Sequence, residues 1–508
     1  MIFRKPSASE LRDVAANLNI DLTDEEVEEF RELVGLTLDD LETIHSLPEP
    51  AVAPEELAYG DRSPTYRPDD EENPHNVWIT KCNVEGASSG PLDDKTVGLK
   101  DNISLAGVEM TCGSRLLEGY VPDVDATVVE RLLDAGATVT GKTNMESFSF
   151  SSSSDTSDFG AVTNPYDESR TVGGSSSGSA AAVATGEVDV ALGCDQGASV
   201  RVPAACCGIV GLDPTTGLVP YTGIFPLDPT IDKVGPMART VADAARTLEA
   251  TAGSDGLDPR QPPDVPTESY THALVDDIQD LTVGLLTEGF AIDESDSDVN
   301  ETVLDAVDRL EGLGAEITEV SVPLHHDAIT LGYMIWGFGG LQTFKQGGQG
   351  SLLDGWYNTG LMETFGKFRR ARADDLPAEG KATLLAMEYV DEKYGSVTYG
   401  RAQNIREDLK HQLNAIFEDV DLVAMPTMPI APFEMDDDAD RTEQAFRTFT
   451  MCRNTVTSSL TKHPSISIPC GTVEGLPTGL MLVGDHFEES TLLRAAYTFE
   501  QQVDWRQA

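Results

Sequence analysis

Two short stretches rich in small residues carry the residue types that acyl-transfer chemistry requires. One is residues 173–182, "GGSSSGSAAA", and the other is residues 193–199, "GCDQGAS". Ser199 follows a predicted strand, so its hydroxyl would lie at a strand end. The small residues before it allow backbone N–H groups to converge on one point, as an oxyanion requires. These features favour a serine-based acyl-transfer site.

A serine nucleophile needs a base, and lysine is the better candidate here. The eight histidines lie beside polar or acidic stretches or in a predicted linker, and the sequence has no Gly-x-Ser-x-Gly elbow. Lys100 lies in the mostly apolar segment "TVGLKDNISLAG". Burial would lower its pKa because burial disfavours the charged form. A lone lysine of this kind more often extends its charged end to solvent.

Residues 173–182 have two other interpretations, a flexible linker and a phosphate-binding loop. A linker is disfavoured because the stretch continues into the apolar run "AAAVATG". A phosphate-binding loop would need lysine where Ser179 stands. A second motif, Ser459-x-x-Lys462, has the spacing found in β-lactamases but lacks the companion motifs. We interpret it as a chance match.

Alternating strands and helices are predicted to position these residues. From residue 76 onward, β-rich runs such as "KTVGLKDNI", "ATVTGKTN" and "VDVALGCD" alternate with helical patterns. This rhythm predicts an α/β fold with a large sheet covered by helices. The sequence contains no internal repeat, so we predict one catalytic domain over residues 76–508.

Residues 1–75 are predicted to form a small helical N-terminal domain and a linker. Ser7 with Glu10, and Thr23 with Glu26, are capping-box patterns that begin two helices. Residues 48–75 are rich in proline and acidic side chains. We expect this domain to serve packing or self-association, and the protein to be a homodimer.

The charge balance excludes several classes of partner. The 508 residues include 35 Lys and Arg against 87 Asp and Glu, a formal net charge of −52. Such a surface repels nucleic acid and anionic membranes, and no apolar run is long enough to span a bilayer. Salt screening makes dense negative charge tolerable. We expect a halophilic acidic surface on a cytoplasmic protein.

The spacing of the cysteines and the lack of metal-binding motifs argue against disulfide bonds and against a metal site. The seven cysteines have no paired spacing, which favours reduced thiols in a cytoplasm. No Cys-x-x-Cys, His-Glu-x-x-His or His/carboxylate cluster is apparent in the sequence. We therefore predict no metal site.

Together these segments resemble the amidase signature family. The resemblance rests on "GLKDNISLAGVEMTCGS" with Lys100, "GGSSSGSAAAVATG" with Ser175, and "GCDQGASVRVPAACCGIVGLDPTTG" with Ser199. It covers roughly residues 76–500 and implies the mixed α/β sheet of that family. The N-terminal helices and "DQGASVRVPAA" are most similar to the bacterial amidases that work beside nitrile hydratases.

The resemblance implies a Ser-Ser-Lys catalytic triad. Ser199 would be the nucleophile, Ser175 the bridging serine after a cis Gly174–Ser175 peptide bond, and Lys100 the base. Ser176 and Asp195 would support these groups by hydrogen bonding. The oxyanion hole would be formed by the backbone N–H groups of Gln196, Gly197, Ala198 and Ser199.

Three positions depart from the family pattern. Ala198 replaces a glycine, and alanine would be strained there only if its φ were positive. Asp213 stands where lysine is common, which we interpret as a surface change toward acidity. Cys206 replaces a phenylalanine and would reshape a pocket wall. Trp336, Phe338 and Trp356 would either face substrate or belong to the core.

The implied activity is hydrolysis of a small-molecule carboxamide to a carboxylate and ammonia, without metal or cofactor. The alternative is the glutamine-hydrolysing subunit of a tRNA-dependent amidotransferase, which the N-terminal helices and "DQGAS" disfavour. A third hypothesis is an acidic scaffold without turnover. The three reactive residues argue against it.

Overall fold

The structure is a computed structural model that describes residues 3–49, 57–60, 62, 64–350, 352–436 and 441–506. The chain forms two compact units, Met1–Glu55 and Glu56–Ala508. The first contains helices α1 (Ala8–Asn17) and α2 (Asp24–Ser46). Both begin with the capping boxes predicted from the sequence, in which the side chains of Ser7 and Thr23 accept the N–H of Glu10 and Glu26.

The second unit is built on one mixed sheet of 11 strands among the described residues, in the order β1-β3-β2-β4-β6-β5-β10-β11-β9-β7-β8. Strand β2 runs parallel to β3 and β4, and β7 runs parallel to β8 and β9, while the other pairs are antiparallel. The strands are β1 Trp78–Glu85, β2 Thr96–Lys100, β3 Thr138–Thr143, β4 Val190–Asp195, β5 Val210–Asp213, β6 Lys233–Ala238, β7 Thr282–Leu286, β8 Glu316–Val320, β9 Leu422–Pro426, β10 Ser465–Val473 and β11 Leu476–Gly484.

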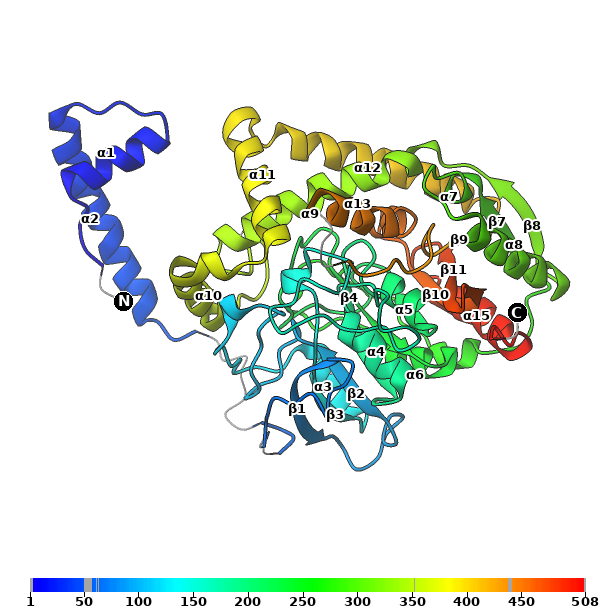
Figure 1. The fold of residues 1–508 in the computed structure, drawn as a ribbon. Coiled ribbons are helices and arrows are strands. Elements are labelled where there is room, and N and C mark those ends of the chain that lie inside the picture. Colours follow the sequence, from blue (N-terminus) through cyan, green and yellow to red (C-terminus); the bar gives the residue numbers. More distant parts are fainter. Residues whose placement is uncertain are drawn as a thin grey trace. The chain divides into compact units, whose positions relative to one another are not determined.

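Helices cover both faces of this sheet (Figure 1). The main ones are α3 Thr127–Asp134, α4 Ser177–Thr185, α5 Arg201–Cys207, α6 Val241–Thr251, α8 Ser297–Gly312, α9 Ala328–Lys345, α10 Thr359–Arg372, α11 Ala378–Tyr394, α12 Val397–Ile416, α13 Arg441–Met451, α14 Thr455–Thr461 and α15 Glu489–Gln502. Successive strand side chains point to opposite faces. In β11, Leu480 and Leu482 therefore join a core with α3, α6, α8 and α15, while Met481 and Val483 join one with α5, α9, α12 and α14. The predicted α/β fold is confirmed.

The described helices are all too short or too polar to cross a lipid bilayer.

Candidate active site

Lys100 and Ser175 lie together in the interior. Lys100 is the last residue of β2, and Ser175 lies just before α4. The Lys100 Nζ donates hydrogen bonds to Ser175 Oγ at 2.7 Å and to the Cys194 carbonyl at 3.2 Å. Both side chains are fully buried. The Gly174–Ser175 peptide bond is cis, as the resemblance implied.

Lys100 differs from the other buried lysines in its partners. Lys142 Nζ lies 3.1 Å from Asp101 Oδ1, and Lys233 forms an ion pair with Asp213. Among the described residues no carboxylate pairs with Lys100. Burial lowers the pKa of Lys100 to about 8, against smaller opposing effects of nearby acidic groups. Near pH 7 a minority of this amine is therefore neutral, and the neutral fraction grows as the pH rises through about 8.

Glu146 is a buried acid beside the site that the sequence analysis did not identify. Its backbone N–H donates to the Ser175 carbonyl at 3.1 Å. Its Oε2 accepts the Thr156 hydroxyl at 2.8 Å. Burial, and then the charge of Asp155, raise the pKa of Glu146 to about 8. Burial therefore disfavours the charged form of Glu146, which is the form that would stabilise a protonated Lys100. The sequence signal that could have identified Glu146 is that it is the single acid in the otherwise uncharged run "TNMESFSFSSSS".

Ser199 lies between β4 and α5, at the wall of a pocket. It is 5% exposed, and its carbonyl accepts the Ser176 N–H at 3.2 Å. This bond joins the two serine-bearing segments. In the described structure no hydrogen bond connects the hydroxyls of Ser175 and Ser199. The other residues that line the pocket are Ser149, Phe150, Ser151, Ser152, Gln196, Gly197, Ala198, Leu227, Trp336, Thr448, Phe449 and Cys452.

Asp195 organises the backbone before Ser199. Its Oδ1 accepts the Gly197 N–H and its Oδ2 accepts the Val200 N–H, both at 2.9 Å. Arg201 binds both carboxylate oxygens, at 2.9 and 3.1 Å. Burial acts to raise the pKa of Asp195, but Arg201 outweighs it and the pKa falls to about 2. The carboxylate is therefore ionised and holds this loop in place.

The hydrogen bonds of this loop bear on the predicted oxyanion hole. The Gly197 N–H already has an acceptor in Asp195. No described residue accepts a hydrogen bond from the backbone N–H groups of Gln196, Ala198 or Ser199. These three donors can therefore serve a ligand. Ala198 is not among the described residues with a positive φ, so alanine carries no left-handed strain at this position.

Asp213 is not a surface residue, and that expectation is wrong. Its strand, β5, is central in the sheet, between β6 and β10. The Asp213 side chain is fully buried, forms an ion pair with Lys233 and lies 3.6 Å from Arg201 Nε. Asp195, Arg201, Asp213 and Lys233 thus form a buried cluster of two negative and two positive charges.

Replacing Arg201 with methionine is expected to destabilise the protein by about 3–5 kcal/mol, because it leaves Asp195 buried without its partner. Chemical denaturation monitored by circular dichroism measures this loss. Arg494 provides the matched control, since its ion pair with Asp280 lies at the surface. Arg494→Met should change stability little. Equal effects of the two substitutions would contradict the structural role of the cluster.

Of the three aromatic residues named as possible pocket walls, only Trp336 lines the pocket at Ser199. Phe338 is buried in the core, with its ring 5.9 Å from that of Tyr399. Trp356 lines a different pocket, which also contains Tyr221 and Arg260. Cys206 is buried beside Met428 and does not line the pocket at Ser199.

Comparison with known proteins agrees with this geometry. The family model described as Amidase matches residues 79–493. The chain belongs to the amidase signature family. This amidase signature protein is therefore a hydrolase that acts on C–N bonds.

Two curated relatives differ in how much of this amidase they match. The A subunit of glutamyl-tRNA(Gln) amidotransferase from Natronomonas pharaonis is 42% identical over 430 residues, which cover 83% of this chain and 98% of the relative. The enantioselective amidase of Rhodococcus rhodochrous is 37% identical over 509 residues, which cover 98% of this chain and 96% of the relative.

A solved structure shares the fold. The crystal structure of the A subunit of glutamyl-tRNA(Gln) amidotransferase from Thermotoga maritima superposes with a TM-score of 0.72 at 29% identity, over 85% of this amidase and 89% of that chain. The predicted family is thus confirmed. The finer resemblance to amidases that work beside nitrile hydratases stays a prediction.

Proposed function

We propose that this enzyme hydrolyses a small-molecule carboxamide to a carboxylate and ammonia through an acyl-enzyme on Ser199. The observation that carries the proposal is the buried, carboxylate-free Lys100 amine, 2.7 Å from the Ser175 hydroxyl. A neutral amine can accept a proton there, which is what a serine nucleophile requires. The pocket at Ser199 would hold the scissile amide.

The proposed proton path runs through both serines. Ser199 Oγ attacks the amide carbon, its proton passes to Ser175 Oγ, and the Ser175 proton passes to Lys100 Nζ. The N–H groups of Gln196, Ala198 and Ser199 would stabilise the oxyanion. The protons return by the same path to the leaving nitrogen, which departs as ammonia. Water then attacks the ester, and Ser199 regains its proton as the carboxylic acid leaves.

The pocket supports a substrate with an apolar part. Phe150, Leu227, Trp336 and Phe449 line it together with four serines. Aliphatic, aromatic and amino-acid amides all have a suitable group to place against these side chains. The proposed chemistry uses only protein groups and water.

The proposal is tested by measuring ammonia release from a panel of aliphatic, aromatic and amino-acid amides, with the purified chain alone and at high salt. We expect turnover of at least one amide by the wild-type protein and none by Ser199→Ala. Turnover by Ser199→Ala at the wild-type rate would refute the proposed nucleophile. A folded wild-type protein that neither hydrolyses any of these amides nor reacts at Ser199 with a fluorophosphonate would favour the scaffold hypothesis.

The pH dependence of kcat/KM should reveal the base. At a pH below about 8, the pKa of Lys100, the side chain is mainly an ammonium ion, which has no lone pair. At a higher pH it is mainly an amine, which can accept a proton. We therefore expect kcat/KM to rise with pH, about tenfold per unit well below pH 8, and to level off above it. Glu146 titrates in the same range, so Glu146→Gln is the control. Loss of the pH dependence in Glu146→Gln would assign it to Glu146 and contradict Lys100 as the base.

A second candidate is the glutamine-hydrolysing subunit of a tRNA-dependent amidotransferase. The 42% identity with the Natronomonas pharaonis protein favours it. The near-complete match with the enantioselective amidase, which covers 98% of this chain against 83%, favours the amidase. Glutaminase activity that requires a copurifying, ATP-dependent partner would support the amidotransferase. Hydrolysis of other amides without any partner would support the amidase.

We also propose a homodimer that works in a salt-rich cytoplasm. Leu33, Leu36 and Ile44 lie on one face of α2 and are exposed by 58–64%, which suits self-association.

The net charge of −52 makes repulsion strong at low salt. We expect the melting temperature to increase from low to molar salt, as measured by calorimetry. No increase would contradict the halophilic interpretation, and a monomeric mass by light scattering would contradict the dimer.

A further inference from the structure

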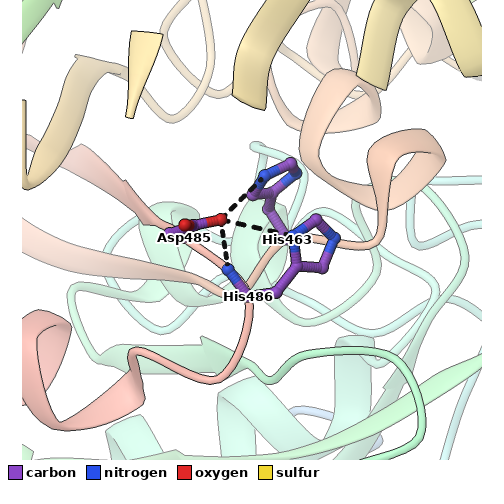
Figure 2. A group of neighbouring side chains, drawn as sticks. All are labelled: His463, Asp485 and His486. Carbon is purple, nitrogen blue, oxygen red and sulfur yellow. Dashed lines mark hydrogen bonds and ion pairs between the residues drawn. The ribbon is translucent and has the colours of Figure 1, made fainter. Parts of the chain in front are cut away.

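Three side chains that can bind a metal meet at one end of the β10–β11 pair. His463 lies between α14 and β10, and Asp485 and His486 follow β11 directly. Ser465 is paired with Val483, and the Gly484 N–H donates to the Pro464 carbonyl at 3.1 Å. Continuing this register brings His463 opposite Asp485. Figure 2 shows the three side chains pointing toward one another.

The hydrogen bonds around both imidazole rings fix where their protons lie. His486 Nε2 is 3.1 Å from the Thr461 carbonyl, which can only accept, so Nε2 carries the proton. His463 Nδ1 is 2.9 Å from Thr461 Oγ1. That hydroxyl donates its own proton to the Thr457 carbonyl at 2.9 Å, so His463 Nδ1 carries a proton as well. In the neutral form of both rings, the lone pairs are therefore on His463 Nε2 and His486 Nδ1.

These two lone pairs face the same carboxylate. His463 Nε2 lies 3.7 Å and His486 Nδ1 lies 3.3 Å from Asp485 Oδ1. His463 is fully buried, and its Nε2 has no hydrogen-bond partner among the described residues. Asp485 Oδ1 also accepts a hydrogen bond from the backbone N–H of His486 at 2.7 Å, which orients the carboxylate. Three possible ligand atoms thus converge within 4.8 Å of one another, and with both rings neutral none of them donates a hydrogen bond to another.

The outer nitrogen of each ring is held by Thr461, whose hydroxyl contacts His463 Nδ1 at 2.9 Å and whose carbonyl accepts His486 Nε2 at 3.1 Å. Neutral imidazoles whose outer nitrogens are hydrogen-bonded are the form in which histidine binds metals.

We propose that His463, Asp485 and His486 bind a first-row divalent metal ion of the Zn²⁺ type. Imidazole and carboxylate ligands suit such ions. Bonds of about 2.0–2.1 Å in a tetrahedral site place neighbouring ligand atoms roughly 3.3–3.4 Å apart. Two of the three separations here, 3.3 and 3.7 Å, are close to that spacing, and the third, between the two ring nitrogens, is within 4.8 Å. Asp485 is half exposed, so water can complete the coordination.

The site would have a structural role. It would join the end of β11 to the turn between α14 and β10, where the His463 ring stacks on Phe417. The His463 carbonyl accepts Lys233 Nζ at 3.2 Å, which connects this turn to the buried cluster with Asp213. The positive charges of Lys410 and Lys233 act on His463 and would oppose a bound dication, so we expect moderate affinity for the metal.

Metal binding to the full chain after chelator treatment tests the proposal without measuring activity. Zn²⁺ and Co²⁺ are the probes, with Mg²⁺ as a hard-cation control. We expect one Zn²⁺ per chain by equilibrium dialysis, a d–d absorption band with Co²⁺, and a higher melting temperature with Zn²⁺ but not with Mg²⁺. Asp485→Asn and His486→Gln alter partly exposed ligands and leave the buried His463 in place.

Each of these two substitutions should weaken Zn²⁺ binding by at least about tenfold and abolish the thermal shift. His272→Gln, which changes an exposed histidine, should leave both unchanged. Circular dichroism in the presence of chelator checks that the variants are folded. The proposal is overturned if the folded wild-type chain does not bind Zn²⁺, or if a folded Asp485→Asn or His486→Gln variant binds Zn²⁺ as tightly as the wild type.

Discussion

Replacing Ser199 with alanine is expected to lower kcat by at least about 10⁴-fold. The substitution removes the oxygen that would form the acyl-enzyme, at the end of the pocket-lining loop whose backbone N–H groups are free. The fold should persist because the change removes one oxygen at a pocket wall. Ammonia release and intact-mass detection of a fluorophosphonate adduct measure the loss of turnover and of the nucleophile separately.

Ser177 offers a matched control for this experiment. It lies in the same serine-rich segment as Ser175, is fully buried, and its hydroxyl has no hydrogen-bond partner among the described residues. Ser177→Ala should therefore retain nearly wild-type activity and labelling. A Ser199→Ala protein that still acquires the adduct at the wild-type rate would show that the nucleophile lies elsewhere.

Replacing Lys100 with methionine is expected to lower kcat by about 10²–10⁴-fold, with the protein still folded. Methionine approximates the volume of the lysine stem but cannot accept a proton. Since Lys100 has no carboxylate partner in the described structure, its removal leaves no buried charge unpaired. The acyl-enzyme should therefore form slowly, in a protein whose denaturation midpoint is close to that of the wild type.

Lys142→Met should have the opposite pattern, in which stability falls and proton transfer at the active site is not directly affected. Lys142 lies on the neighbouring strand β3 and is as deeply buried, but it pairs with Asp101 at 3.1 Å. Its loss leaves that carboxylate buried without a cation and should cost about 3–5 kcal/mol of stability. Denaturation and ammonia release on both variants separate the roles. Similar activity in Lys100→Met and the wild type would remove Lys100 from the mechanism.

The part of the structure that depends on local sequence was predicted well. The capping boxes at Ser7 and Thr23 involve residues three positions apart, so they can be recognised without knowledge of the fold. The alternation of strands and helices likewise predicted an α/β sheet. The strand order was not predicted from these patterns, because β5 pairs with β10 across some 250 residues of sequence and no local pattern records that pairing.

Candidate site residues could be named from the sequence only where a motif contained them. Lys100, Ser175 and Ser199 were named from their segments, and the first two lie in hydrogen-bond contact. Asp213 was misassigned to the surface because its burial depends on strands that join β5 from distant segments. Glu146 was missed for a similar reason, since only the tertiary structure brings it beside Ser175.

The His463, Asp485 and His486 cluster shows the same limit. These residues do not have the spacing of a metal-binding motif, and the sequence analysis predicted no metal. The register of β10 and β11 brings them together, and that register is a tertiary property.

The central claim is that a neutral, buried Lys100 activates Ser199 through Ser175. Its most direct test is the rate of fluorophosphonate labelling as a function of pH, with the modified residue located by peptide mass spectrometry, because this measurement needs no knowledge of the substrate. We predict an adduct on Ser199 whose rate of formation rises with pH through about 8, the pKa of Lys100, and then levels off. A rate independent of pH over this range, or an adduct on another residue, would contradict the account.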